Sequence, residues 1–229
     1  MTNEIIRKRK SIRQYDMNKL DEETLNKVRS KIDSLKPLFP EIQYSIEIAE
    51  KTKGLFNVKA PHYLIFGSEN KEGYLENIGF IGQQLDLFLS ENGLGACWLG
   101  AAKPKEKEKS PLPYVIAIGF GKPAEPLHRE IEEFKRKSLE EITEGNNDER
   151  LEAARLAPSG MNAQNWYFVG DGKIRCYRKK VLLNFMSKLS MIDMGIALCH
   201  IAEESDDFRY VNETYAPLRK GYIYMGTVV

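Results

Sequence analysis

The sequence predicts an α+β protein. Short apolar runs typical of strands lie between longer segments whose apolar residues recur at helical spacing. The order helix, strand, strand, helix is partly repeated after Gly145. The expected strands lie at 61–67, 96–99, 114–120, 166–169, 174–177 and 222–228, and the expected helices at 21–34, 74–91, 149–156 and 192–203.

Local signals justify the elements of the first part. Asp21 can cap the helix that runs to about Ser34. Residues 42–48 alternate between apolar and polar side chains, which indicates a half-buried strand or extended segment. The helix at 74–91 carries its apolar residues on one side.

The second part begins at a boundary between Gly145 and Asn146, so we expect two halves, 1–145 and 146–229. Asp148 can cap the helix at 149–156. Asp171 and Gly172 separate two strand-like runs, as in a hairpin.

Two short similarities suggest that the halves are related. The tripeptide Arg-Lys-Ser at 136–138 repeats the one at 9–11, and the helix around Gly195 is similar to the helix around Gly82. Each similarity is weak by itself.

Composition and charge exclude several classes of protein. The chain has 229 residues, of which 42% are hydrophobic and 29% are charged, as in ordinary globular proteins. We find no uncharged apolar segment near the ~20 residues of a membrane-spanning helix, and residues 1–13 are charged where a signal peptide is apolar. We therefore expect a cytoplasmic protein without a membrane partner. A formal net charge of +1 gives no global reason to expect a nucleic-acid partner.

The cysteines and histidines offer no clear metal site. Cys97, Cys176 and Cys199 lie in apolar patterns without a CxxC pair, so we expect reduced core residues. His200 and Glu203 lie one helical turn apart and could face one ion, but they lack a second pair. We expect no bound metal.

A basic cluster, RKRKSIR at 7–13, surrounds Ser11. Together with the lysine-rich stretch at 103–109, it could be a nucleic-acid patch, or it could be a solvated face. The Ser11 hydroxyl and the Arg13 guanidinium would also fit a single phosphate monoester.

The segment NGLGACWLGAA at 92–102 ends a helix and forms a short strand that breaks at Gly100. Small residues from Gly100 to Ala102 leave backbone N–H groups open to a flat ligand.

The loop APSGMNAQNW at 157–166 carries more polar chemistry than an ordinary turn needs. Pro158 fixes φ and Gly160 lets the backbone approach a partner closely. Its short polar side chains are Ser159, Asn162 and Gln164. We expect this loop to lie against a ligand.

Together these three motifs resemble the nitroreductase family of FMN-dependent oxidoreductases, specifically its single-chain branch with two nitroreductase-like halves. RKRKSIRQYD is similar to the family's phosphate-binding RRSxR motif, GLGACWLG to its GLGTCWLG-type segment, and APSGMNAQNW to its APSxxNxQPW loop. The resemblance implies a nitroreductase-like α+β fold of mixed, mainly antiparallel sheets flanked by helices, with two pseudo-symmetric halves.

One departure from the family bears on the cofactor site. Ordinary members carry APSxxNxQPW soon after RRSxR, whereas here the segment after Asp21 lacks it and the loop lies in the second half. Ordinary members are dimers with FMN at the subunit interface, so the resemblance implies that the halves mimic that dimer within one chain. We expect one FMN per chain, because the other pocket would lack a complete RRSxR and a GLG segment, and a monomer or weak homodimer. Asn165 stands where the family usually has proline.

The resemblance assigns three groups of residues to the cofactor. The FMN phosphate and ribityl end would be held by Arg9, Lys10, Ser11 and Arg13, joined by Arg136. The isoalloxazine ring would pass the backbone of Leu99, Gly100 and Ala101. The flavin or the bound substrate would meet Ser159, Asn162 and Gln164.

The resemblance also implies the chemistry. NADH or NADPH would be the electron donor, and a small flat acceptor such as a nitro compound or quinone would follow it into one pocket by a ping-pong scheme. The flavin carries such chemistry, so we expect no catalytic side chain. The alternative is a non-catalytic FMN-binding or flavin-sensing module.

Overall fold

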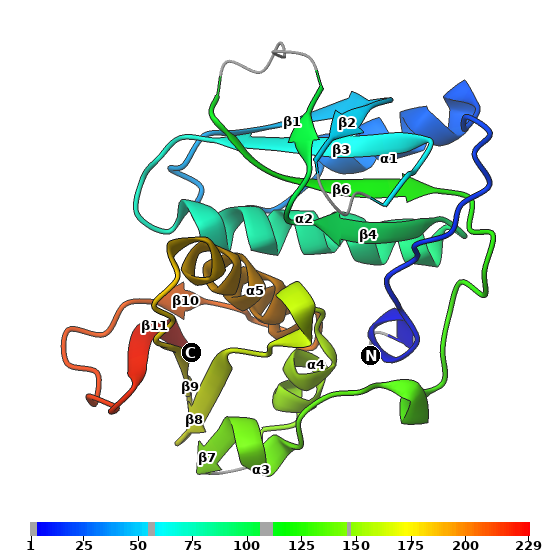
Figure 1. Cartoon of the computed structure of the whole chain (residues 1–229). Coiled ribbons are helices and arrows are strands. Elements are labelled where there is room, and N and C mark those ends of the chain that lie inside the picture. Colours follow the sequence, from blue (N-terminus) through cyan, green and yellow to red (C-terminus); the bar gives the residue numbers. More distant parts are fainter. Residues whose placement is uncertain (1–3, 55–57, 106–111, 146–147) are drawn as a thin grey trace.

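A computed structural model describes residues 4–54, 58–105, 112–145 and 148–229. Two sheets lie on opposite sides of a central pair of helices, with the first sheet at the top of Figure 1 and the second at the bottom. The helices are α2 (Tyr74–Glu91) and α5 (Asn184–Glu203). Both are largely buried, and together with the inner faces of the sheets they form the main apolar core.

The first sheet has four antiparallel strands in the order β1-β3-β6-β4. These strands are β1 (Tyr44–Ala49), β3 (His62–Ser68), β4 (Gly95–Leu99) and β6 (Tyr114–Gly121). Beside them lie a two-stranded ribbon of β2 (Thr52–Lys53) with β5 (Lys103–Pro104), and α1 (Glu22–Asp33). Asp21 caps α1 as expected, because its Oδ1 accepts a hydrogen bond from the N–H of Thr24 at 2.7 Å.

The second sheet has five strands in the order β10-β11-β9-β8-β7. These strands are β7 (Thr143–Gly145), β8 (Trp166–Gly170), β9 (Ile174–Lys179), β10 (Tyr210–Val211) and β11 (Tyr222–Val228). The β7–β8 pair is parallel and the other three pairs are antiparallel. The short helices α3 (Leu139–Ile142) and α4 (Arg150–Leu156) precede β8. Because β7 pairs with β8, the chain before the expected boundary at 145 already contributes to the second sheet.

The two sheets share one topology. Along the chain, the first half runs β1, β3, α2, β4, β6 and the second runs β8, β9, α5, β10, β11. If β1, β3, β4 and β6 correspond to β8, β9, β10 and β11, the order β1-β3-β6-β4 of the first sheet corresponds to β8-β9-β11-β10. The second sheet, read from β8 to β10, has this order. The fold is therefore the mixed, mainly antiparallel α+β arrangement with two related halves that the resemblance implies.

The two central helices meet backbone to backbone at a pair of glycines. A β-carbon on Gly79 would overlap the carbonyl oxygen of Ile192, and one on Gly195 would overlap the carbonyl oxygen of Glu76. Each glycine thus faces the residue three positions before the other, as in a two-fold interface. The partner of Gly195 is therefore Gly79 and not Gly82, the residue expected from the sequence. Gly82 instead makes room for the Trp98 ring.

Most expected elements are present, and two expectations need correction. Helix α5 begins eight residues before the expected start at 192, because its first turns are exposed and lack an apolar pattern. By length and composition, with a mean hydropathy of 1.3, this helix could also cross a membrane. No segment of that kind was expected from the sequence. In the structure 61% of that segment is buried within the protein, as in an ordinary core helix.

The three cysteines are buried and free, as expected. Part of the lysine-rich stretch, 106–109, and Asn146 at the expected boundary lie outside the described residues.

Replacing Gly79 with alanine should lower the free energy of unfolding by about 2–3 kcal/mol, since the added methyl group would force the helices apart. Urea denaturation followed by circular dichroism measures this loss. Gly93→Ala is the control. It meets nothing within 4 Å but has a φ of +77°, so its loss should stay near 1 kcal/mol. Equal losses for the two variants would contradict a tight crossing at Gly79.

Candidate functional site

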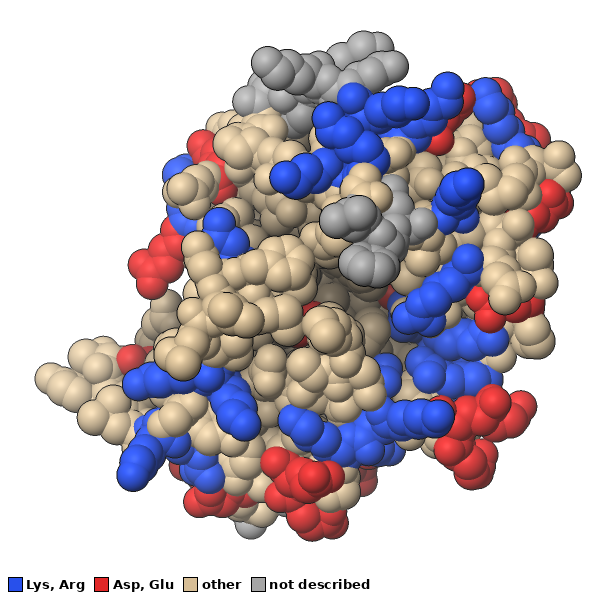
Figure 2. Space-filling view, viewed as in Figure 1, with Lys and Arg blue, Asp and Glu red and all other residues tan. Residues whose placement is uncertain are grey.

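A pocket of about 750 Å³, counted to its open mouth, lies between the edge of the first sheet and α5. Its walls include Ser11, Arg13, Cys97, Trp98, Gly100 and Ile116 from the first half, and Pro158 to Met161, Phe185, Leu189, Ile192, Asp193 and Ile196 from the second. Figure 2 shows the hollow near the centre of this face, with lysine and arginine side chains along one side. The pocket thus joins all three motifs found in the sequence.

Four of the eleven expected site residues line this pocket: Ser11, Arg13, Gly100 and Ser159. They come from both halves, as the resemblance implies. The N-terminal segment reaches the pocket because it runs beside β4, where the backbone of Ser11 bridges to Ala96. The other seven residues lie behind the walls or near them.

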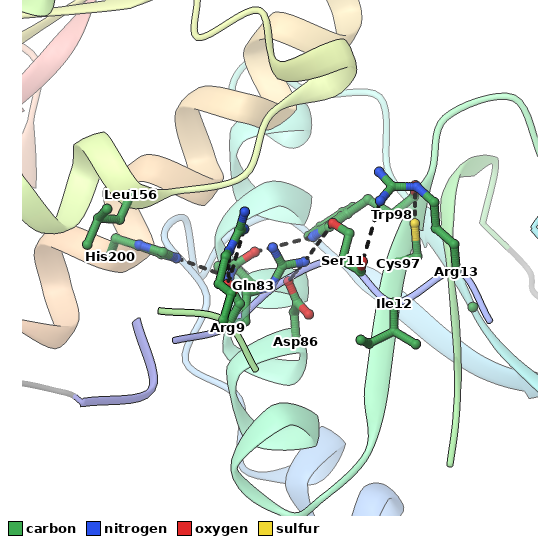
Figure 3. Close-up of polar contacts among 12 residues, drawn as sticks. Arg9, Ser11, Ile12, Arg13, Gln83, Asp86, Cys97, Trp98, Leu156 and His200 are labelled. Carbon is green, nitrogen blue, oxygen red and sulfur yellow. Dashed lines mark hydrogen bonds and ion pairs between the residues drawn. The ribbon is translucent and has the colours of Figure 1, made fainter. Parts of the chain in front are cut away.

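Arg9 is buried behind the pocket and not on its wall. Its side chain is 2% exposed, and its Nη2 forms an ion pair of 2.7 Å with Oδ2 of Asp86 on α2 (Figure 3). The same nitrogen donates to the Ser11 hydroxyl at 3.2 Å. Arg9 therefore orients the Ser11 hydroxyl from behind the pocket wall. Asp86, which the sequence reasoning missed, compensates the charge of Arg9.

Lys10 points toward Glu125, with its Nζ 3.5 Å from Oε2. Oε1 of Glu125 accepts the backbone N–H groups of Arg13 at 2.7 Å and Gln14 at 3.1 Å. These bonds lower the pKa of Glu125, although partial burial opposes them. Glu125 thereby fixes the segment that carries Arg13.

Leu99 and Ala101 flank Gly100 on opposite sides. Leu99 is buried in a small apolar cluster of the first half, whereas Ala101 is exposed in the turn after β4. Gly100 between them faces Leu189 and Phe185 of α5 across the pocket.

The second-half loop is held in an unusual backbone conformation. Met161, Asn162 and Gln164 all have positive φ, at 53°, 56° and 47°. Such residues are strained and persist where surrounding contacts over-determine them. Here the contacts are made with residues 135–137.

Asn162 and Gln164 supply those contacts. The Asn162 side chain donates to the carbonyl of Lys135 at 2.7 Å and accepts from Nη1 of Arg136 at 2.6 Å. Oε1 of the buried Gln164 accepts the backbone N–H of Lys137 at 2.8 Å. The loop, whose residues 158–161 line the pocket, therefore holds Arg136 through Asn162.

Arginines from distant segments gather next to two segments that contribute to the pocket, 7–13 and 157–166. Arg129 donates through Nε and Nη2 to the carbonyl of Arg9, 3.2 Å for each bond, and its guanidinium lies 3.9 Å from the Phe134 ring. Arg136 lies 5.6 Å from the same ring. Burial, and then the charges of its arginine neighbours, lower the pKa of Arg136 to about 9 and that of Arg129 to about 10.

This cluster has spare capacity for an anion. Among the described residues, no hydrogen-bond acceptor meets the buried Nε of Arg136, and no carboxylate forms a salt bridge with Arg136 or Arg129. An anion placed here would relieve the repulsion between the guanidinium groups. Arg129 was missed because no sequence pattern links it to Arg9 or Arg136.

A chain of hydrogen bonds connects the pocket wall to the buried interior. The Trp98 Nε1–H donates to Oε1 of Gln83 at 3.2 Å, and Nε2 of Gln83 lies 3.1 Å from Nε2 of His200 (Figure 3). Nδ1 of His200 lies 2.9 Å from the carbonyl oxygen of Ala153, and burial lowers the pKa of His200 to about 3. Neutral His200 thus uses both nitrogens within the core. Among the described residues, no group of three His, Cys, Asp or Glu side chains could hold a metal ion.

Asp193 is a pocket residue that the sequence reasoning missed. Its Oδ1 accepts the backbone N–H of Gly160 at 2.8 Å, which ties the loop to α5. A single acidic residue within the apolar run MIDMGIAL was the signal that could have identified it.

The related half contains a matching bond. Oδ1 of Asn77 on α2 accepts the backbone N–H of Phe39 at 3.0 Å. Asn77 and Asp193 are separated by the same number of residues as Gly79 and Gly195. In addition, an LxP tripeptide begins at Leu35 and a glutamine follows at Gln43, with the same spacing as the LxP at Leu156 and Gln164. The first half therefore contains a divergent counterpart of the loop, which the sequence reasoning did not detect.

A second hollow lies at the position that the two-fold relation predicts. It is lined by Phe39 with residues 70–76 around the start of α2, and by Tyr210, Asn212, Tyr224 and Arg178 of the second half. Its charged lining is mixed, with Glu41, Glu72, Glu76 and Glu213 against Lys71 and Arg178. Among the described residues that line it, Arg178 is the single arginine.

Two comparisons with known proteins bear on the fold and the family of the chain. A family model described as "Putative TM nitroreductase" matches residues 1–205. The crystal structure of a protein from Thermotoga maritima described as a "putative nitroreductase" aligns with 99% of this chain and 91% of its own, at 21% identity and a TM-score of 0.68. Comparison with curated proteins finds no significant match.

Other solved structures align with a part of the chain. A nitroreductase family protein from Clostridium difficile 630 aligns with 61% of this chain and 94% of its own, at 16% identity and a TM-score of 0.48. An FMN-dependent nitroreductase from Clostridium difficile R20291 aligns with 63% of this chain and 98% of its own, at 15% identity and a TM-score of 0.46.

Replacing Asn162 with alanine should lower the free energy of unfolding by about 2–3 kcal/mol. Two hydrogen bonds are lost, and alanine must adopt a φ near 56°, which it tolerates less well than asparagine. Asn162→Gly removes the same bonds without the backbone strain, so it should lose about 1–2 kcal/mol. The neighbouring Asn165 makes no side-chain hydrogen bond to residues 135–137 within the described part of the chain, so Asn165→Ala should change stability by less than ~0.5 kcal/mol. Equal stability of Asn162→Ala and Asn165→Ala in urea denaturation would disprove the anchoring role.

Proposed function

This chain belongs to the nitroreductase family, and from that premise we propose that it is an FMN-dependent oxidoreductase. It passes electrons from NADH or NADPH to a flat acceptor such as a quinone or a nitro compound. The observation that carries this proposal is an apolar pocket with under-compensated arginines at one end. FMN has the matching division into a flat ring and a dianionic phosphate.

The residues present fit this cofactor on three counts. The buried and unpartnered Nε of Arg136 offers a donor to a phosphate oxygen. Ser11 and Arg13 on the pocket wall add a hydroxyl and a second guanidinium. Trp98, Ile116 and Ile196 supply apolar surface for a flat ring.

The roles of the arginines differ in this proposal. Arg13, Arg129 and Arg136 hold the phosphate, with Ser11 as a hydrogen-bond donor. Arg9 acts through its neighbours, because its guanidinium orients Ser11 and its carbonyl holds Arg129. Asn162 and Gln164 likewise act through Arg136 and the 135–137 backbone.

When bound, FMN supplies the reversible uptake and release of a hydride. The chain's own task is to hold two flat molecules in contact and exclude water from between them. Leu189 and Ile192 cover the pocket from α5, and the half-exposed Phe185 with Met161 stands at its mouth. Donor and acceptor would share this one pocket and would therefore enter it in turn. Since both walls come from one chain, the proposed functional unit is a monomer.

The first test is the absorbance spectrum of the purified protein, followed by anaerobic addition of NADH and of NADPH. We expect a flavin spectrum that bleaches with at least one nucleotide and returns when a quinone is added. A flavin that no nucleotide reduces would favour the non-catalytic FMN-binding module. Lack of a flavin spectrum after addition of FMN would remove the proposal.

Arg13→Gln and Arg136→Gln should each weaken FMN binding about 10-fold or more, since each removes a charge-assisted contact of about 1.5–3 kcal/mol. Fluorescence quenching of added FMN measures the dissociation constant. Arg29→Gln, on the exposed face of α1, is the control and should bind FMN like the wild type. Unchanged affinity in both pocket variants would place the phosphate elsewhere.

The protein should bind one FMN per chain. The second hollow has the same place in its half but carries four glutamates and no arginine group, so a phosphate there would meet like charge. Calorimetric titration of the cofactor-free protein gives the stoichiometry. A value of two would show that the second hollow is also a flavin site.

A further inference from the structure

Asp193 is the only carboxyl group that lines the pocket among the described residues. Its side chain lies on α5 behind the loop and is 5% exposed. Oδ1 is occupied by the N–H of Gly160, and within the described part of the chain no cation forms a salt bridge with this carboxyl group. A buried carboxyl group without a cation favours its protonated form more than an ordinary aspartate does.

The environment of Asp193 also favours its protonated form. Burial raises its pKa to about 7, and the Gly160 N–H opposes the rise only in part. The other titratable groups on the pocket wall are Arg13 and the thiol of Cys97, whose pKa burial also raises. Glu76, a buried carboxyl group on α2, lines the second hollow with Arg178 and not this pocket. Asp193 can therefore exchange a proton near neutral pH.

The pseudo-symmetry provides an internal control for what this position requires. Asn77, the counterpart of Asp193, makes the same bond from the same place on its helix, to the N–H of Phe39. A neutral amide is thus sufficient to anchor the loop to the helix. The ionisable carboxyl group occurs in the pocket next to the arginine cluster. Anchoring the loop does not require a group that can ionise.

We propose that Asp193 is the proton donor to the acceptor in this pocket. The proposal rests on the proposed oxidoreductase function and adds a protein side chain to chemistry that the flavin was expected to perform alone. The substrate class follows from it: acceptors whose oxygen must gain a proton when a hydride arrives, such as quinones and nitro compounds.

Reduction of a quinone to a hydroquinone requires one hydride and one proton. Bound FMN, once reduced, would supply the hydride, which carries two electrons and one proton to the quinone. The O–H bond of Asp193 breaks and an O–H bond forms on the quinone oxygen, which yields the hydroquinone and an aspartate. The carboxylate then takes a proton from water at the pocket mouth, so one hydride and one proton are consumed per quinone.

Asp193→Asn tests this assignment, because the chain already uses asparagine at the related position. The variant should retain FMN with an affinity within about 2-fold of the wild type and be reduced by the nucleotide at a similar rate. Reoxidation by a quinone at pH 6 should fall about 10-fold or more, since general acids contribute roughly 10²–10⁴ to such steps. The wild-type rate should decrease as the pH rises through about 7, whereas the variant's rate should not.

Glu76→Gln is the matched control. Burial also raises the pKa of Glu76 to about 7, but this carboxyl lies in the second hollow, so its loss should leave the pH profile of reoxidation unchanged. The assignment would be overturned if Glu76→Gln altered the pH dependence of reoxidation while Asp193→Asn retained the wild-type pH dependence. Equal slowing of both half-reactions together with FMN loss in Asp193→Asn would also overturn it, in favour of a purely structural role.

A second readout does not depend on turnover. Infrared difference spectra of the FMN-free protein between pH 5 and about 9 report buried carboxyl groups as they lose their protons. We expect Asp193→Asn to lose one component that titrates near pH 7 and Glu76→Gln to lose another. Identical spectra for Asp193→Asn and the wild type would refute the proposal. A protein that holds flavin and is reduced by nucleotide but shows no effect of Asp193→Asn refutes this inference alone, whereas one without flavin refutes the proposed function as well.

Discussion

The close crossing of α2 and α5 is the constraint on which the rest of the structure depends. At Gly79 and Gly195 each helix backbone meets the backbone of the other, so no side chain separates them. The reciprocal spacing makes this contact a two-fold interface inside one chain, and it places two sheets of equal topology on opposite sides. Two related pockets follow, because each half presents one helix to the edge of the other half's sheet.

The two pockets share a frame but differ in their electrostatics. One adjoins Arg129 and Arg136, whose positive charges are only partly compensated within the protein. The other carries four glutamates with Arg178 and Lys71. Because charges interact strongly in a partly buried site, this difference in side chains changes the ligand that each pocket favours without changing the fold.

The conformation of the second-half loop depends on contacts made far from it in sequence. Three non-glycine residues with positive φ are unfavourable in isolation, and the bonds to 135–137 and to Asp193 compensate for them. The same bonds hold Arg136 against the loop. Strain in the loop and the position of the arginine cluster are therefore two consequences of one set of hydrogen bonds.

The sequence by itself determined the local elements and the three motifs. Helix α2, the hairpin of β8 and β9, and strand β11 were predictable because periodicity and turn residues are properties of a short segment. Only the tertiary structure decided which side chains face the pocket. Arg9 belongs to the phosphate motif but pairs with Asp86, and Gly195 meets Gly79, because burial and pairing depend on residues that are distant in the chain. Asp193 shows both sides: its sequence context marks it as unusual, but only packing reveals that Asn77 performs the same structural task.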